Sequence, residues 1–104
     1  MKVILLPYAI ADLNEIKDYI ARENPAAAKK VAQRIKKSLQ LLSKNPYLST
    51  VKVEQDILEW HIPSLPYTLP YQIVNNEIQI LRVFHESQNK PAKWENHSNK
   101  PFNT

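Results

Sequence analysis

Residues 77–85 read Glu77-Ile78-Gln79-Ile80-Leu81-Arg82-Val83-Phe84-His85 and follow directly on the pair Asn75-Asn76. The apolar run predicts a single buried β-strand, and the two asparagines suit a two-residue type I′ turn because asparagine tolerates positive φ. An arginine and a histidine near the end of an apolar strand must find partners or reach water. Arg82 and His85 are therefore the first candidates for a functional site.

The residues before this turn alternate between apolar and polar, which is typical of half-buried strands. The apolar positions are Leu58, Trp60 and Ile62 in one segment and Tyr67, Leu69, Tyr71 and Ile73 in the next. Pro70 lies inside the second segment, and because proline cannot donate to a strand ladder, it requires a sheet edge or a bulge. Together with residues 77–85, these segments predict an antiparallel meander of three or four strands.

The N-terminal half is typical of one short strand, residues 2–6, followed by two amphipathic helices. Their apolar stripes consist of Ala9, Leu13, Ile16 and Ile20, then Ala28, Val31, Ile35, Leu39 and Leu42. Asp12 is assigned to the opposite, solvent face of the first helix. Asn24-Pro25 caps the second helix and Asn45-Pro46 ends it. The sequence therefore predicts an α+β fold of order β-α-α-β-β-β, with a further short strand allowed, in which an antiparallel two-helix hairpin packs on one face of a small, mainly antiparallel sheet.

The composition excludes several classes of function. The chain has 104 residues, enough for one core, of which 43% are hydrophobic and 23% are charged, as in an ordinary folded domain. It has no cysteine and no glycine, which excludes disulfides, cysteine-based zinc sites and a glycine-rich phosphate loop. No apolar run is long enough to span a bilayer. We therefore expect a cytoplasmic protein without a cofactor, a metal or a membrane partner.

The net charge of +4 is unevenly distributed along the chain. Residues 8–24 carry two cations against four acids, whereas residues 25–45 carry six cations and no acid. An exposed helix usually places acids four residues from bases, at about 0.2 to 0.5 kcal/mol for each pair, and the second helix forgoes these pairs. The six cations are Lys29, Lys30, Arg34, Lys36, Lys37 and Lys44. They form either a solvated surface or a site for an anionic partner, which would be nucleic acid or an acidic peptide.

Several short segments, taken together in their order and spacing, indicate the family to which the chain is similar. They are Ala11-Asp12-Leu13 with Ile16 and Tyr19-Ile20, Asn24-Pro25 with Ala27-Ala28, Leu42 before Asn45-Pro46, Pro66-Tyr67 with Tyr71, and residues 78–85 with Pro91 and Trp94. Together these segments resemble the RelE/ParE superfamily of bacterial toxins from type II toxin-antitoxin operons. The resemblance covers residues 1–94 and leaves residues 95–104 as a polar C-terminal tail.

The resemblance implies a growth-inhibiting toxin that is neutralised by a cognate antitoxin, whose disordered segment folds as it wraps the toxin. Operator DNA would be bound only through the complex with the antitoxin. RelE-like members cleave mRNA on the ribosome without a metal, whereas ParE-like members poison DNA gyrase. The target is therefore expected to be either DNA gyrase or the ribosome with its mRNA.

Metal-free RNA cleavage requires a base, an acid and cations that hold the phosphorane. The residues available for these roles are Arg82, His85, His61, Lys52 and Glu54. In RelE-like nucleases that use a histidine acid on the last strand, His85 is the matching position, and Arg82 with Lys52 would bind the phosphate. Arg82 can instead pair with Glu59 or Glu77 across the sheet.

Two features favour the ParE-like alternative. Arg82 and His85 are three residues apart, so their side chains leave opposite faces of a regular strand. Leu58 and Gln88 stand where many relatives carry arginines, so cations are fewer at the site. We therefore expect a ParE-like toxin that binds a protein target. The alternatives are an mRNA endoribonuclease and a degenerate toxin that only binds the antitoxin or the operator.

The remaining candidates have both a structural and a functional interpretation. His61 is expected to be a surface pair or a capped residue. Trp60, Tyr67 and Tyr71 can stack on bases, although aromatic rings at alternate strand positions usually lie in the core. The binding surface expected from the sequence consists of Lys52, Lys29, Lys30, Arg34, Lys37, Trp60 and Tyr71.

Overall fold

A computed structural model describes residues 1–49, 51–54 and 56–86, which form two helices and six strands. In chain order the elements are β1 (Lys2–Leu5), α1 (Pro7–Glu23), α2 (Pro25–Lys44), β2 (Lys52–Glu54), β3 (Ile57–His61), β4 (Tyr67–Val74), β5 (Glu77–Ile80) and β6 (Phe84–His85). The expectations for Gln88, Pro91, Trp94 and the tail after residue 94 lie outside the described residues.

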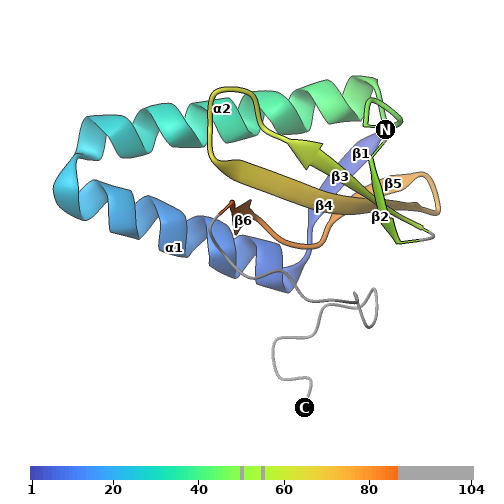
Figure 1. Cartoon of the computed structure of the whole chain (residues 1–104), viewed down its shortest axis with the longest axis horizontal. Helices are drawn as coiled ribbons and strands as arrows, with labels where there is room; N and C mark the ends of the chain where they lie inside the picture. The colour runs from blue at the N-terminus through green and yellow to red at the C-terminus, as the bar shows by residue number, and fades with distance from the viewer. Residues whose placement is uncertain (50, 55, 87–104) are drawn as a thin grey trace, which may run out of the picture.

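Both helices end where the sequence predicts. α1 starts at Pro7 and ends at Glu23, and the side chain of the next residue, Asn24, accepts a hydrogen bond from the Ala27 N–H at 3.1 Å. Asn24 is therefore both the C-cap of α1 and the N-cap of α2. α2 ends at Lys44, directly before the predicted stop at Asn45-Pro46. The short connection folds the two helices into an antiparallel hairpin (Figure 1).

The strands form one mixed sheet with the order β1-β5-β4-β3-β2, and β6 pairs with β4. Neighbours from β2 to β5 are antiparallel, as is the β4–β6 pair, whereas β1 runs parallel to β5. The predicted α+β fold and its antiparallel meander are confirmed. β1 and β5 are more than 70 residues apart in the sequence. Their parallel pairing therefore could not be predicted from a local pattern.

The core lies between the helical hairpin and alternate residues of β4 and β5. Its fully buried members, each at most 1% exposed, include Ala9, Ile35, Leu42, Leu69, Tyr71, Ile78 and Ile80. Partly buried residues of both helices pack around them, including Leu13, Ile16, Val31 and Leu39. The two predicted helical stripes therefore face the sheet.

The turn between β4 and β5 has the predicted conformation. Asn75 and Asn76 have φ values of 50° and 61°, and Val74 pairs with Glu77 on either side of them. Two central residues with positive φ are the mark of a type I′ turn. Asparagine supplies this conformation in a chain that has no glycine.

The prediction of one continuous strand over residues 77–85 is wrong. β5 ends at Ile80, residues 81–83 are not part of a strand, and pairing with β4 resumes only at Phe84. Arg82 therefore lies in a break between two strands. This break decides which way its side chain points.

Pro70, in the middle of β4, explains the break. The N–H and C=O groups of a strand residue point toward the same neighbouring strand. The Pro70 carbonyl accepts the Leu81 N–H at 2.9 Å, so the position of its missing N–H also faces this segment. Because no ladder hydrogen bond can form there, the neighbouring chain leaves the sheet, as expected for a proline inside a strand.

Candidate functional site

One carboxylate ties the break between β5 and β6 to α1. Asp12 accepts hydrogen bonds from the Arg82 Nε at 2.7 Å and from Nη2 at 2.9 Å. It also accepts the backbone N–H of Val83 at 2.9 Å. The side chains of Arg82 and Asp12 are 28% and 13% exposed, so this is a partly buried, bidentate ion pair. It fixes the segment that leads into β6.

The guanidinium of Arg82 also lies near two aromatic rings. Its central carbon is 5.2 Å from the centroid of Tyr8 and 4.7 Å from that of Phe84, within the range of cation–π attraction. The hydrogen bonds to Asp12 raise the pKa of Arg82 above its ordinary value, although burial acts in the opposite direction. Arg82 therefore stays charged and has three side-chain partners, Asp12, Tyr8 and Phe84.

The structure corrects two expectations about these residues. Asp12 does not lie on a solvent face, and Arg82 does not pair with Glu59 or Glu77 across the sheet. Asp12 follows Ala9 by three residues, so it lies at the edge of the apolar stripe, where a carboxylate can reach the sheet. The position of Asp12 in the sequence could therefore have indicated that its carboxylate faces the sheet. That its partner is Arg82 follows only from the break between β5 and β6.

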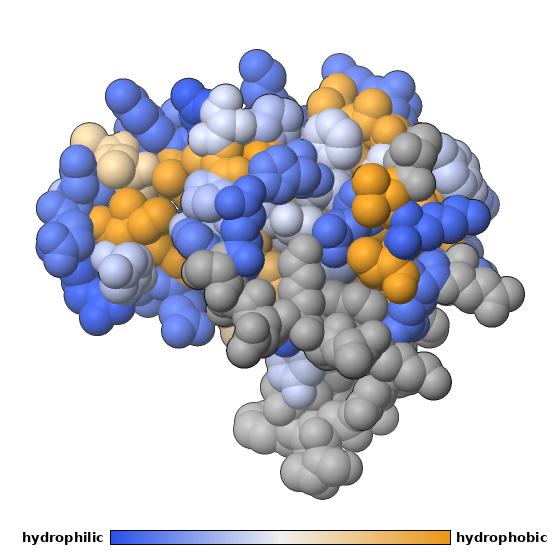
Figure 2. Space-filling view, viewed as in Figure 1, coloured by the Kyte–Doolittle hydropathy of each residue, from blue (hydrophilic) through white to orange (hydrophobic). Residues whose placement is uncertain are grey.

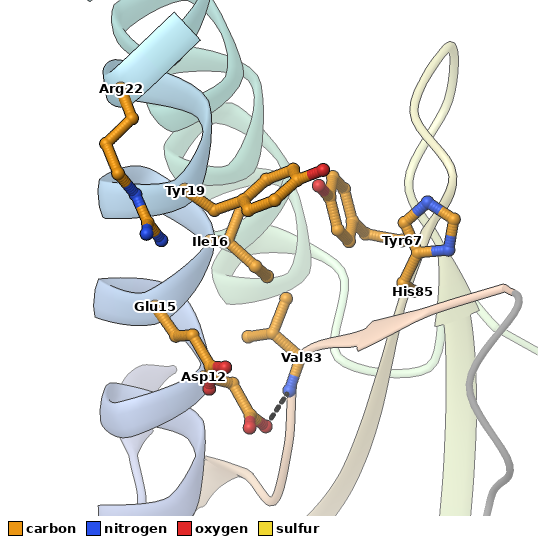
Figure 3. Close-up of a pocket in the computed structure, with 8 residues that line it drawn as sticks. All are labelled: Asp12, Glu15, Ile16, Tyr19, Arg22, Tyr67, Val83 and His85. Carbon is orange, nitrogen blue, oxygen red and sulfur yellow. Dashed lines mark hydrogen bonds between the residues drawn. The ribbon is translucent and has the colours of Figure 1, made fainter.

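A hollow of about 250 Å³ lies beside this ion pair, between α1 and the end of the sheet. Its described lining consists of Asp12, Glu15, Ile16, Tyr19, Arg22, Tyr67, Val83 and His85. Figure 3 shows Tyr19 of α1 and Tyr67 of β4 pointing toward each other across the hollow. The hollow therefore contains His85, the residue expected to act as an acid in a nuclease.

His85 packs against Tyr67 within this hollow. The two rings meet edge to face, with centroids 5.4 Å apart and an angle of 85° between the planes. Burial raises the pKa of Tyr67, and Tyr19 raises it further. Among the described lining residues, Arg22 is the only lysine or arginine, and its Nε donates to the Asp18 carbonyl at 3.4 Å. The hollow offers few cations to a phosphate.

The other residues expected in a nuclease are not brought together with His85. Lys52 pairs with Leu58 of β3, which pairs with Tyr71 of β4. His85 lies on β6 and pairs with Tyr67 of β4, so Lys52 lies three strands away, beyond β4 and β3. Its register position is also roughly 13 Å further along β4, at about 3.3 Å per residue. Arg82, Lys52 and His85 therefore do not form one site.

His61 forms a pair at the surface, as its structural interpretation predicts. Its Nε2 lies 3.4 Å from the Glu86 carboxylate, and both side chains are more than half exposed. In the β3–β4 register His61 is opposite Thr68, whereas His85 is opposite the preceding residue, Tyr67. Because successive strand residues point to opposite faces, the two histidines lie on different sides of the sheet.

Trp60 and Tyr71 pack inward, which corrects the expectation that they bind a partner. Tyr71 is 0% exposed and its hydroxyl donates to the Pro46 carbonyl at 3.0 Å. Trp60 is partly buried against the core, and its Nε1 donates to the Ser38 hydroxyl at 3.5 Å. Their rings fill the interior instead of offering a face for stacking.

The Tyr71→Phe variant is expected to lose less of its free energy of unfolding at alkaline pH than the wild type does. Burial raises the pKa of Tyr71 above its ordinary value of 10.0, although the backbone of Ser49 acts against this. Since the folded-state pKa is higher than the unfolded one, the folded protein favours the neutral phenol. This stabilisation is complete below the unfolded pKa and is lost as the pH rises through the folded pKa. Phenylalanine does not titrate, so the stability of the Tyr71→Phe variant does not fall for this reason as the pH rises.

Urea unfolding between about pH 8 and pH 11 measures the difference. At the lower pH, Tyr71→Phe should be about 1 kcal/mol less stable than the wild type, because the hydrogen bond to Pro46 is lost. This difference in stability between the variant and the wild type should become smaller as the pH rises. Tyr47→Phe is the control, since Tyr47 is 72% exposed, and should follow the wild type. A gap that stays constant over the whole range would contradict the role given to Tyr71.

Four of the basic residues expected to bind a partner lie together on α2, and the fifth, Lys52, lies on another element, the edge strand β2. Lys29, Lys30, Arg34 and Lys37 are all exposed on α2, and Lys52 is exposed on β2. Figure 2 shows separate hydrophilic side chains projecting along the edge of the molecule that α2 forms. This surface is distinct from the lining of the hollow.

In the part of the chain that the structure describes, no group of three or more histidine, cysteine or acidic side chains is placed to hold a metal ion. No helix among these residues is long and apolar enough to cross a membrane.

A two-helix hairpin on a mainly antiparallel sheet is the fold of the small toxins of the RelE/ParE superfamily. A sequence model of the family described as ParE toxin of type II toxin-antitoxin system, parDE, matches residues 3–90. The chain belongs to this family and is a toxin of a type II toxin-antitoxin system.

Similar proteins include two toxins and one solved structure. The toxin candidate Y4kP of Sinorhizobium fredii is 31% identical over 83 residues, which are 80% of this chain and 85% of the relative. Toxin RelE2 of Caulobacter vibrioides is 30% identical over 83 residues, covering 77% and 89% of the two chains. A chain of the chromosomal ParDE system from P. aeruginosa has a TM-score of 0.72 at 25% identity, over 82% of this chain and 95% of that one. Proteins named RelE and ParE both occur among these relatives. The similarity therefore establishes the superfamily but does not identify the cellular target of the toxin.

Proposed function

We propose that this toxin is ParE-like: it inhibits growth by binding DNA gyrase and is neutralised by a cognate antitoxin. The observation that carries the proposal is the bidentate ion pair between Arg82 and Asp12. A guanidinium that is engaged with a carboxylate and two aromatic rings is poorly placed to stabilise the phosphorane of RNA cleavage. The chemistry of a RelE-like site would have to proceed without it.

The positions of the remaining candidates support the same proposal. His85 lies in the hollow, Lys52 lies three strands away, and His61 lies on the other face of the sheet. General acid–base catalysis needs its groups within hydrogen-bonding reach of one substrate. A toxin that acts by occupying a protein surface has no such requirement.

Exposed apolar side chains support an antitoxin partner. Val51, Val53 and Leu48 are 56%, 39% and 37% exposed near β2. A second apolar hollow is lined by residues of β1, α1 and α2, which include Val3, Leu5, Ile10 and Leu39. A disordered antitoxin segment that folds on binding would cover surfaces of this kind. Operator DNA would then be bound through the antitoxin complex.

His85→Ala is expected to leave growth inhibition within a few-fold of the wild type. If His85 were the acid of a nuclease, its loss would lower cleavage by about 100-fold to 10,000-fold. Growth after induction in bacteria, with and without the co-expressed antitoxin, gives the comparison. His61→Ala is the matched control, because it removes a histidine from the opposite face, and circular dichroism checks that both variants fold.

Two assays after induction separate the candidate targets. Inhibition of supercoiling by purified gyrase, with trapped double-strand breaks, is the expected result. Transcript ends that map to ribosome-positioned codons, and that vanish in His85→Ala, would replace the proposal with a RelE-like endoribonuclease. That alternative is favoured by the place of His85 in the hollow and by the similarity to a toxin named RelE2. No growth defect with antitoxin binding retained would instead indicate a degenerate toxin.

A further inference from the structure

The outer face of α2 carries a concentration of positive charge that the proposed function does not use. Its six cations are Lys29, Lys30, Arg34, Lys36, Lys37 and Lys44, and all of them are exposed. α2 contains no acid, and none of the six makes an ion pair with any residue that the structure describes. The charge is therefore not neutralised within the described part of the protein.

Four of these cations form one stripe along the helix. Lys30, Arg34, Lys37 and Lys44 are separated by four, three and seven residues, which places them on one side of the helix. At about 1.5 Å per residue the stripe is roughly 21 Å long, and its first three cations are spaced by about 5 to 6 Å. Successive phosphates of a nucleic acid backbone have a similar spacing. Across the hairpin, α1 carries four acids against two cations, so α2 is the more positive of the two helices.

The chemistry of this face fits nucleic acid better than a protein. The centre of a protein interface is apolar and poor in charge, whereas an interface with DNA is polar and strongly positive. The largest exposed apolar side chain on α2 is Leu41, which is 40% exposed and flanked by Lys37 and Lys44. α2 has no aromatic residue on which an unpaired base could stack, so single strands lack their usual platform.

We propose that α2 docks on the phosphate backbone of duplex DNA, at the mouth of the major groove. The major groove of B-form DNA admits an α-helix, whereas that of A-form RNA is too deep and narrow. The lysines and Arg34 contact phosphates and no base, so binding does not depend on sequence. This surface lies outside the hollow and needs neither gyrase nor antitoxin. It departs from the expectation that the toxin reaches DNA only through its antitoxin.

The test is the affinity of the purified toxin for a short fluorescent DNA duplex of arbitrary sequence, measured by anisotropy over a range of salt concentrations. The test variant carries Lys30→Gln, Arg34→Gln and Lys37→Gln. Removing three phosphate contacts should weaken binding roughly 100-fold near 0.1 M salt and make the slope of log affinity against log salt shallower by about 3. The control variant carries Lys2→Gln, Lys17→Gln and Arg22→Gln, which remove three cations from β1 and α1. It has the same net charge and should bind DNA nearly as well as the wild type.

Three results would overturn the proposal. They are equal weakening in the two triple variants, unchanged binding in the α2 variant, and tighter binding of a duplex RNA of the same length. Equal weakening would show that only net charge matters. Five of the six substituted side chains are exposed and Lys17 is partly exposed, so both variants should fold, and circular dichroism checks this. The outcome is independent of the supercoiling assay, so failure here leaves the assignment of gyrase as the target standing.

Discussion

Asp12→Ala should destabilise the protein by about 3 kcal/mol, as expected when one partner of a buried ion pair is removed. The substitution leaves the guanidinium of Arg82 and the backbone N–H of Val83 without their acceptor in a partly buried place. Urea unfolding measures the free energy, and thermal unfolding should show a midpoint lower by roughly 15 °C for a domain of this size. The toxin should also accumulate less in cells.

Arg82→Met should cost less than Asp12→Ala, about 1 to 2 kcal/mol. It keeps an apolar side chain beside the aromatic rings and leaves Asp12 with the Val83 N–H as a donor. The double variant should be less destabilised than the sum of the two single variants, which reports the coupling between the side chains. Asp18→Ala, which removes an exposed acid from the same helix, should change stability by less than about 0.5 kcal/mol. Equal effects at Asp12 and Asp18 would show that the ion pair is not structural.

Leu42→Ala should have an effect of similar size for a different reason. Leu42 is 0% exposed and joins α2 to the core beneath it. Truncation removes apolar contacts and leaves a cavity, at about 3 kcal/mol for a leucine in a well-packed interior. The helical hairpin would then be less firmly held on the sheet, and urea unfolding at neutral pH gives the measurement.

Leu41→Ala is the matched control for Leu42→Ala. The two leucines are neighbours on α2, so the substitution changes helix propensity by the same amount in both. Leu41 is 40% exposed, so its loss should cost well under 1 kcal/mol. If both variants were equally stable, α2 would not pack on the sheet through the face that contains Leu42.

The Arg82 site shows why a candidate residue could be named from sequence while its role could not. Its position on an apolar stretch singled out Arg82, because a charge there needs a partner. The partner, Asp12, is 70 residues away and was assigned to the wrong face of its helix. Pro70 predicts a sheet edge or a bulge in its own strand. Only the assembled sheet shows that the irregularity is instead a break in the neighbouring segment, between β5 and β6. The same holds for Lys52 and His85, whose separation follows from strand register.

The sequence by itself determined the two helices with their asparagine caps, the Asn75-Asn76 turn, the order of one strand, two helices and an antiparallel meander, and the basic surface of α2. These features depend on residues within a few positions of one another, where spacing, capping and backbone preference act. Only the tertiary structure decided the parallel pairing of β1 with β5, the partner of Arg82 and the inward packing of Tyr71. Each of these depends on which distant segments meet, and that is settled by packing and hydrogen bonding across the whole sheet.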